Sequence, residues 1–205
     1  ADSLVGQQGV PEELYQEFLS DITEEIDREN KIITDLLSLV KMDKKAADMN
    51  IVNMNINELL ENILKRLRPI ADQRSIDLIL DSFRPVTADV DEVKFTLAIS
   101  NLVENGIKYN VDEGWVRVTL DADHKYFYVT VADSGLGIPE DSIERIFERF
   151  YRVDKSHSRE IGGTGLGLAI TRSSIVMHHG TIKVSSKEGE GTTFNVKIPL
   201  SYIPS

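Results

Sequence analysis

The sequence has no cysteine and no hydrophobic run long enough to cross a bilayer. Without cysteine, the 205 residues cannot form a disulfide framework, a thiol nucleophile or a Cys-ligated zinc site. A membrane-spanning helix needs about 20 apolar residues in succession, and no stretch approaches that length. The first residues also lack the basic start and apolar stretch of a secretion signal. These absences predict a chain that works in water.

Positive charge is scarce as well. The chain has 23 lysines and arginines against 34 aspartates and glutamates, which gives a formal charge of −11. At 28% charged and 41% hydrophobic residues, the composition is typical of a globular protein with one sizeable core and at most two modest domains. Because so acidic a surface is poorly suited to a phosphate backbone, we predict no nucleic-acid partner.

Glycine and further proline are missing between Pro11 and Lys45. Apolar residues recur there at steps of mostly three and four, which predicts one amphipathic helix. At about 1.5 Å per residue this helix would be roughly 50 Å long, too long for a small domain to cover. Its apolar stripe therefore predicts a partner helix. An ordinary surface helix packed on the globular part is the alternative.

Glycine is also missing from residues 46 to 105, whereas eleven of the thirteen glycines lie between Gly106 and Gly191. Because glycine permits unusual dihedrals and close ligand approach, we expect function in this later half. The pattern predicts helices at 57–71, 91–109 and 167–179, and strands at 51–56, 76–81, 115–121, 126–132, 181–186 and 193–198. Alternating strands and helices with hairpins predict an α/β fold, whose mixed sheet is covered by helices on one face.

A polar stripe marks one face of the predicted helix at 91–109. Asn101, Asn105 and Lys108 are spaced to share that face. Asparagine is a middling helix former, so two at one-turn spacing are poor choices for helix stability alone. An amide oxygen suits Mg²⁺, and a lysine one turn further on can meet a phosphate oxygen. A solvated polar face is the alternative.

Two glycine-containing segments also indicate ligand binding. At 133–137, Asp133 ends a predicted strand before two glycines that let a flat ring approach the backbone, although an ordinary Asp-initiated turn is the alternative. At 162–167, four glycines run directly into a helical pattern, where free amide groups can bind an anion. That run fits neither a dinucleotide fingerprint nor a P-loop. A flexible linker is its alternative.

A basic segment lies between these two in an otherwise acidic chain. Residues 143–161 carry six basic side chains: Arg145, Arg149, Arg152, Lys155, His157 and Arg159. Such a segment predicts a mobile cover over a polyanion, but acids interleave with the bases, so a mixed-charge surface segment is the alternative. Taken together, the amide stripe, the acid, the glycine turn and the basic cover indicate a nucleoside triphosphate with Mg²⁺.

In order and spacing, these motifs resemble the catalytic region of sensor histidine kinases, within the ATPase superfamily that includes gyrase, Hsp90 and MutL. The matching stretches are 101–110 for the N box, 133–137 for the G1 box, 146–151 for the F box, 163–167 for the G2 box and 189–194 for the last glycine motif. The resemblance implies a two-layer α/β sandwich with a mixed sheet and bound ATP and Mg²⁺ over residues 50–205. It implies that residues 1–45 hold the second, long helix of a dimerisation and phosphotransfer hairpin.

The resemblance also implies a role for each matching residue. Asn105 is expected to ligate Mg²⁺ with support from Asn101, while Lys108 and Tyr109 contact the phosphates and the flank of the nucleotide. Asp133 is expected to accept the adenine amino hydrogen, with Thr193 nearby through water. The other implied contacts are Gly135, Gly137 and Ile138 around the base, and Arg152, Gly163, Gly165, Leu166 and Gly167 around the phosphates.

The sequence departs from a complete histidine kinase at one point. The family's phosphate-accepting histidine lies on the first helix of the hairpin, and no histidine stands in such a context here. The resemblance therefore implies an ATP-binding fragment whose acceptor comes from a hairpin of the same subunit or of a homodimer mate. A response regulator receiver domain is the implied final partner. The parent protein is expected in the bacterial cell membrane, with this domain on the cytoplasmic side.

Other readings of the sequence remain open. One is a water-activating ATPase of the same superfamily, although those enzymes have a glutamate where this chain has Asn101. Another is a serine kinase that inhibits a sigma factor. A third, from a different class, is a non-catalytic dimer module in which the nucleotide only regulates.

Overall fold

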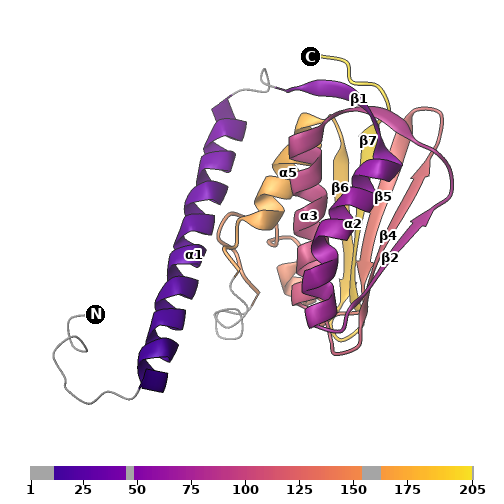
Figure 1. Cartoon of the computed structure of the whole chain (residues 1–205). Helices are drawn as coiled ribbons and strands as arrows, with labels where there is room; N and C mark the ends of the chain where they lie inside the picture. The colour runs from indigo at the N-terminus through magenta and orange to yellow at the C-terminus, as the bar shows by residue number, and fades with distance from the viewer. Residues whose placement is uncertain (1–11, 45–48, 154–162, 205) are drawn as a thin grey trace.

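A mixed five-stranded sheet forms one of the two layers of the fold (Figure 1). The computed structural model describes residues 12–44, 49–153 and 163–204. In spatial order the strands are β2 (Asp77–Ser82), β4 (Trp115–Ala122), β5 (Tyr126–Asp133), β7 (Gly191–Pro199) and β6 (Thr181–Lys187). β2 runs parallel to β4, and the other neighbours are antiparallel. The prediction of a mixed sheet is confirmed.

Three helices cover one face of this sheet: α2 (Ile56–Gln73), α3 (Glu92–Lys108) and α5 (Gly167–Met177) (Figure 1). A short 3₁₀ turn, η1 (Glu140–Ser142), follows β5. Between the two layers lies the apolar core, in which the rings of Phe95 and Phe127 meet edge to face at 5.9 Å. The predicted two-layer α/β sandwich is therefore confirmed.

A small second sheet was not expected. β1 (Ile51–Asn55) pairs antiparallel with β3 (Thr87–Asp91), and no strand was predicted at 87–91. The strand alternates polar and apolar residues, with Ala88 and Val90 completely buried, but over five residues this alternation is too short a signal to identify a strand. β3 leads directly into α3, and thereby fixes where that helix begins.

Side-chain caps define the starts of two helices. Asn55 accepts a hydrogen bond from the Glu58 backbone amide and returns one to the Glu58 carboxylate, a reciprocal cap on α2. Asp91 accepts from the Lys94 backbone amide at 3.0 Å and so caps α3. Each cap satisfies backbone donors that would otherwise lack a partner at a helix start.

The predicted long helix is present as α1 (Glu12–Lys44), which stands beside α5 (Figure 1). The globular part covers only a portion of it. Its exposed apolar side chains include Leu14, Leu19, Ile26, Ile33 and Leu37. Among the helices that the structure describes, none is both long enough and apolar enough to span a membrane.

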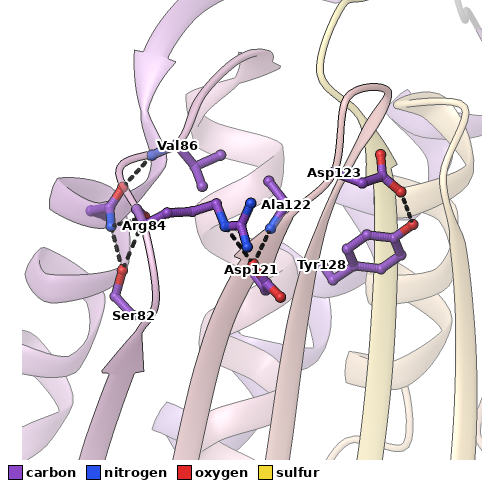
Figure 2. Close-up of polar contacts among 8 residues, drawn as sticks. Ser82, Arg84, Val86, Asp121, Ala122, Asp123 and Tyr128 are labelled. Carbon is purple, nitrogen blue, oxygen red and sulfur yellow. Dashed lines mark hydrogen bonds and ion pairs between the residues drawn. The ribbon is translucent and has the colours of Figure 1, made fainter.

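Polar contacts tie together the end of the sheet at the β4–β5 hairpin (Figure 2). Arg84 forms an ion pair with Asp121 at 2.8 Å, which joins the β2–β3 loop to β4. In the hairpin, Asp123 accepts from the Tyr128 hydroxyl at 2.6 Å and from the backbone amides of the turn. The Tyr128 hydroxyl holds the pKa of Asp123 at about 2. This hairpin lies at the opposite end of β5 from Asp133.

A buried histidine connects α5 to the start of α3. The His178 Nε2 atom accepts from the Asp91 backbone amide at 2.9 Å, while Nδ1 lies 2.7 Å from the Ser174 carbonyl oxygen. Because a backbone amide can only donate, Nε2 must be unprotonated and Nδ1 must carry the hydrogen. Burial lowers the pKa of His178 and so favours this neutral form.

His178 should make stability depend on pH below neutrality. The unfolded chain binds a proton at His178 near its ordinary pKa of about 6.5, more readily than the folded chain. The free energy of unfolding should therefore be highest above about pH 6.5 and fall as the pH drops below it. Thermal melts between about pH 7.5 and 5.5 should show this fall, and it should be smaller in His178→Gln.

The exposed His124 in the β4–β5 hairpin provides the control for this measurement. His124→Gln should retain the wild-type pH dependence of the melting temperature. If wild type and His178→Gln lose stability equally over the same pH range, His178 is not the titrating group.

Candidate functional site

A cavity of about 460 Å³ opens between the second half of α3, the end of β5 and the segments that flank residues 154–162. Its volume is in the range of small-molecule sites. The wall includes polar side chains of α3, glycine backbone from 163–167 and apolar side chains such as Ile138, Ile146, Leu168 and Phe194. Most residues singled out from the sequence lie around this cavity.

The polar stripe of α3 faces the cavity. Asn101, Asn105 and Lys108 all line it, as does Glu104 between them. Asn101 donates from its amide nitrogen to the Gly167 carbonyl oxygen at 3.1 Å, which joins α3 to the start of α5. Burial lowers the pKa of Lys108, and the nearby Lys31 ammonium lowers it further. The stripe therefore presents amide oxygens and a partly desolvated ammonium to one space.

Asp133 lies at the end of β5 and also lines the cavity. Its Oδ1 atom accepts from the backbone amides of Gly135 at 2.8 Å and Thr192 at 3.2 Å. Burial raises the pKa of Asp133 to about 6, although these two bonds act in the opposite direction. Because both bonds go to Oδ1, Oδ2 is the oxygen that can accept from a ligand.

The turn after Asp133 brings backbone close to the cavity. Gly137 and Ile138 line it, whereas Gly135 sits behind Asp133 and does not. Gly137 has a φ of +72°, and a Cβ there would lie 2.1 Å from the Lys187 carbonyl oxygen. Both constraints require glycine at 137. Tyr109 lines the cavity too, and its carbonyl oxygen accepts from the Leu136 amide at 2.9 Å.

The expectation for Thr193 was wrong by one position. Thr192 pairs with Asp133 across the sheet and lines the cavity, while Thr193 pairs with Ala132 and does not line it. Since side chains alternate between the two faces of a strand, adjacent residues cannot both face Asp133. The Thr192 hydroxyl is 2.9 Å from the Ser186 hydroxyl, which in turn donates to the Gly191 carbonyl oxygen.

The glycine turn contributes Gly163, Thr164, Gly165 and Gly167 to the cavity, but not Leu166. Leu166 is completely buried and packs with Ala169 and Ile170. Its amide donates to the Thr164 hydroxyl at 3.2 Å. The Leu166 side chain therefore anchors the turn to the core, and the expected place of Leu166 beside the phosphates stays a prediction.

The described part of the basic segment, residues 143–153, contacts the glycine turn. The Phe150 amide donates to the Gly165 carbonyl oxygen at 2.9 Å, and both residues have a positive φ. Arg152 lines the cavity, whereas Arg145 stacks over the Tyr151 ring at 4.3 Å. Lys155, His157 and Arg159 lie outside the described residues, so the expectation that they cover a polyanion stays a prediction.

Several lining residues were not predicted from the sequence. Glu104 follows from the same helical spacing as Asn101, and its orientation toward the cavity could have been inferred from the i, i+3 rule. Lys31 and Asp35 come from α1, where nothing in the local pattern separates them from other charged residues. No group of three histidines, aspartates or glutamates suited to a metal occurs in 12–44, 49–153 and 163–204. Asn105 lines the cavity with an amide, whose oxygen suits Mg²⁺, and its role as a metal ligand stays a prediction.

Residues 90–202 match the family described as histidine kinase-, DNA gyrase B- and HSP90-like ATPases. The chain belongs to this ATPase family. It is 35% identical over 185 residues to the sensor histidine kinase WalK of Bacillus subtilis, covering 89% of this chain and 30% of that protein. The resemblance to sensor histidine kinases is confirmed. The chain spans less than half the length of the curated relatives WalK and RppB that it matches.

Solved histidine kinases have the same fold as this ATPase-family chain. The nucleotide-free catalytic domain of histidine kinase ThkA matches with a TM-score of 0.66 and 28% identity, covering 75% of this chain and 97% of that one. ThkA in complex with the response regulator protein TrrA matches with a TM-score of 0.76 and 25% identity, covering 94% and 53%. The second match includes α1, so the long helix has a counterpart in that kinase.

Removing the charge of Asp133 should stabilise the ligand-free protein. Burial raises the pKa of this carboxyl from 3.8 to about 6, so its contribution to stability is greatest below the unfolded pKa and is lost as the pH rises through about 6. Asp133→Asn retains an oxygen that can accept from Gly135 and removes the charge. Its melting temperature at about pH 7.5 should exceed that of wild type, and the difference should shrink at about pH 4.5.

Asp112→Asn is the matched control, because Asp112 is exposed after α3. It should not stabilise the protein at either pH. An Asp133→Asn protein that melts at or below the wild-type temperature at about pH 7.5 would contradict a cost of burying this carboxylate.

Proposed function

We propose that this chain binds Mg·ATP and is the catalytic part of a sensor histidine kinase, which transfers the γ-phosphoryl group to a histidine. The observation that carries the proposal is one cavity that joins a buried carboxylate, Asp133, to the amide and ammonium stripe of α3. The carboxylate suits a base with an exocyclic amine, and the stripe suits a phosphate chain with a divalent cation.

The end of the cavity at Asp133 fits adenine. The Asp133 Oδ2 oxygen can accept from the exocyclic amine, while Ile138, Ile146 and Phe194 offer apolar surface to a flat ring. Gly137 lets the backbone approach that ring, because its position excludes any side chain. This end of the cavity would therefore both orient the base and bury its ring.

The opposite end fits a triphosphate. Lys108 and Arg152 carry positive charge there, and the turn at Gly163 to Gly167 presents backbone amides at the start of α5. Asn105 would hold Mg²⁺, which when bound would neutralise charge on the phosphates. Phosphoryl transfer asks a protein mainly to position groups and neutralise charge, and these residues do both.

The acceptor histidine comes from outside this cavity. None of the three histidines in the described part of the chain, His124, His178 and His179, lines it. His178 is buried with both ring nitrogens engaged, and His124 lies in the far hairpin. An imidazole nitrogen supplied by a helical hairpin would attack the γ-phosphorus as the bond to the β-phosphate oxygen breaks, releasing ADP and the imidazole proton.

A water-activating ATPase is less well supported. Asn101 cannot accept a proton from water, and its amide is already bonded to the Gly167 carbonyl oxygen. Glu104 is an acid in the cavity, but its carboxylate is paired with the Lys31 ammonium at 3.5 Å. Hydrolysis would therefore lack a poised base, which favours transfer to a better nucleophile.

The same proposal assigns partners and domains. The exposed apolar stripe of α1 supports a homodimer, in which residues 1–45 belong to a helical-hairpin domain and 50–205 form the catalytic domain. We propose a response regulator receiver domain as final phosphate acceptor, supported by the ThkA–TrrA complex. The parent protein would sit in the bacterial cell membrane with this domain in the cytoplasm.

Mg·ATP should stabilise the fold. At one hundred times the dissociation constant, a ligand that binds only the folded state adds about 2.7 kcal/mol. Asn105→Ala should lose most of the Mg²⁺-dependent part of this effect, because it removes the amide oxygen, whereas Asn195→Ala on the open face of the sheet should not. Thermal melts of wild type and the two variants with ATP, in the presence and absence of Mg²⁺, measure these effects. An unchanged melting temperature with saturating Mg·ATP would exclude the site.

Transfer itself can be measured with a supplied acceptor. The chain, incubated with γ-labelled ATP and a separate hairpin that carries the acceptor histidine, should label that hairpin and then a receiver domain. The label should be acid-labile and alkali-stable, as expected for a phosphorylated imidazole. Tight ATP binding without any transfer would instead favour the non-catalytic dimer module, and label on serine would favour the anti-sigma kinase.

A further inference from the structure

Two charged side chains of α1 reach the cavity. Lys31 and Asp35 lie one helical turn apart and both line it. The Asp35 Oδ2 atom accepts from the Thr164 hydroxyl at 2.8 Å, which fixes α1 to the glycine turn. The Lys31 ammonium lies 3.5 Å from the Glu104 carboxylate, which fixes α1 to the stripe of α3. The long helix therefore borders the phosphate end of the cavity.

At that end, two ammonium groups share one space. Lys31 and Lys108 both line the cavity, and their repulsion adds to the burial that lowers the pKa of Lys108. The nearby carboxylates of Glu104 and Asp35 raise this pKa in part, but neither forms an ion pair with the Lys108 ammonium. Like charges brought together in a partly desolvated space are unfavourable unless an anion lies between them.

The existing partner of Lys31 can be exchanged at little cost. The Lys31 side chain is 46% exposed and the Glu104 side chain 27% exposed, so water screens their pair. Pairs of this kind contribute little to stability. A phosphate oxygen, with its higher charge and several acceptor positions, would compete well for the same ammonium.

We propose that Lys31 binds the phosphate chain of the nucleotide, so that α1 supplies a ligand to the ATP site. This inference rests on the proposed function. The bond from Thr164 to Asp35 holds the helix in reach, and the Lys31 ammonium moves from Glu104 to a phosphate oxygen. By linkage, a nucleotide that gains this contact must favour the docked position of α1 to the same degree.

Calorimetric titration of the whole chain with Mg·ATP tests the inference. Lys31→Gln should weaken Mg·ATP binding by about tenfold, the effect of losing one charge-assisted contact. Binding of adenosine, which has no phosphate, should not change. Lys31→Arg should restore most of the affinity because it retains the charge. Lys65→Gln removes the same charge from an exposed position on α2 outside the cavity and should bind like wild type.

The outcomes separate this inference from the proposed function. If wild type does not bind Mg·ATP, the proposed function itself fails. If wild type binds and Lys31→Gln binds equally or more tightly, the role of Lys31 fails while the proposed function stands. Equal weakening of adenosine and ATP by Lys31→Gln would also overturn the inference, since it would indicate a general disturbance of the cavity. Thermal melts without nucleotide verify that each variant is folded.

Discussion

The site depends on the rotational position of α3, because this helix serves the core and the cavity at once. Phe95, Ile99 and Leu102 bury its apolar face, and the face with Asn101 and Asn105 lines the cavity. One residue of slip would rotate the helix by about 100° and carry the amides away from the cavity. The cap at Asp91 and the bond from the Asp91 amide to His178 fix where the helix starts. Contacts at the start of α3 thus determine which of its side chains face the cavity in its second half.

The cavity collects groups that are unfavourable without a ligand. Asp133 and Lys108 are both partly buried, and burial moves the pKa of each toward its neutral form. Phe150 has a positive φ beside the glycine turn. Each of these costs stability in the free protein, and the two buried charges suit the amine and the phosphates of the proposed nucleotide. Such concentrated strain and desolvation are typical of binding sites, where function limits stability.

Helical and strand periods predict much of this arrangement from the sequence. Asn101, Asn105 and Lys108 share a face by spacing alone, and the structure places all three on one cavity. The prediction failed where a single residue changes the outcome. Thr192 and Thr193 are chemically identical, and only the pairing of Thr192 with Asp133 decides which one faces the cavity. β3 was missed because its pairing with β1 joins residues far apart in sequence, which no local pattern reports.

The part that α1 plays in lining the cavity could not be predicted for the same reason, because it depends on contacts between residues far apart in sequence. Its apolar stripe indicates that one face packs, but the polar residues that meet a neighbour depend on where the helix lies. Lys31 and Asp35 become distinct only because Glu104 and Thr164 stand opposite them. The long helix ends at Lys44, yet the cavity is lined by side chains from both sides of that point. The boundary suggested by sequence is therefore not a boundary of the site, because α1 and the catalytic domain line one cavity.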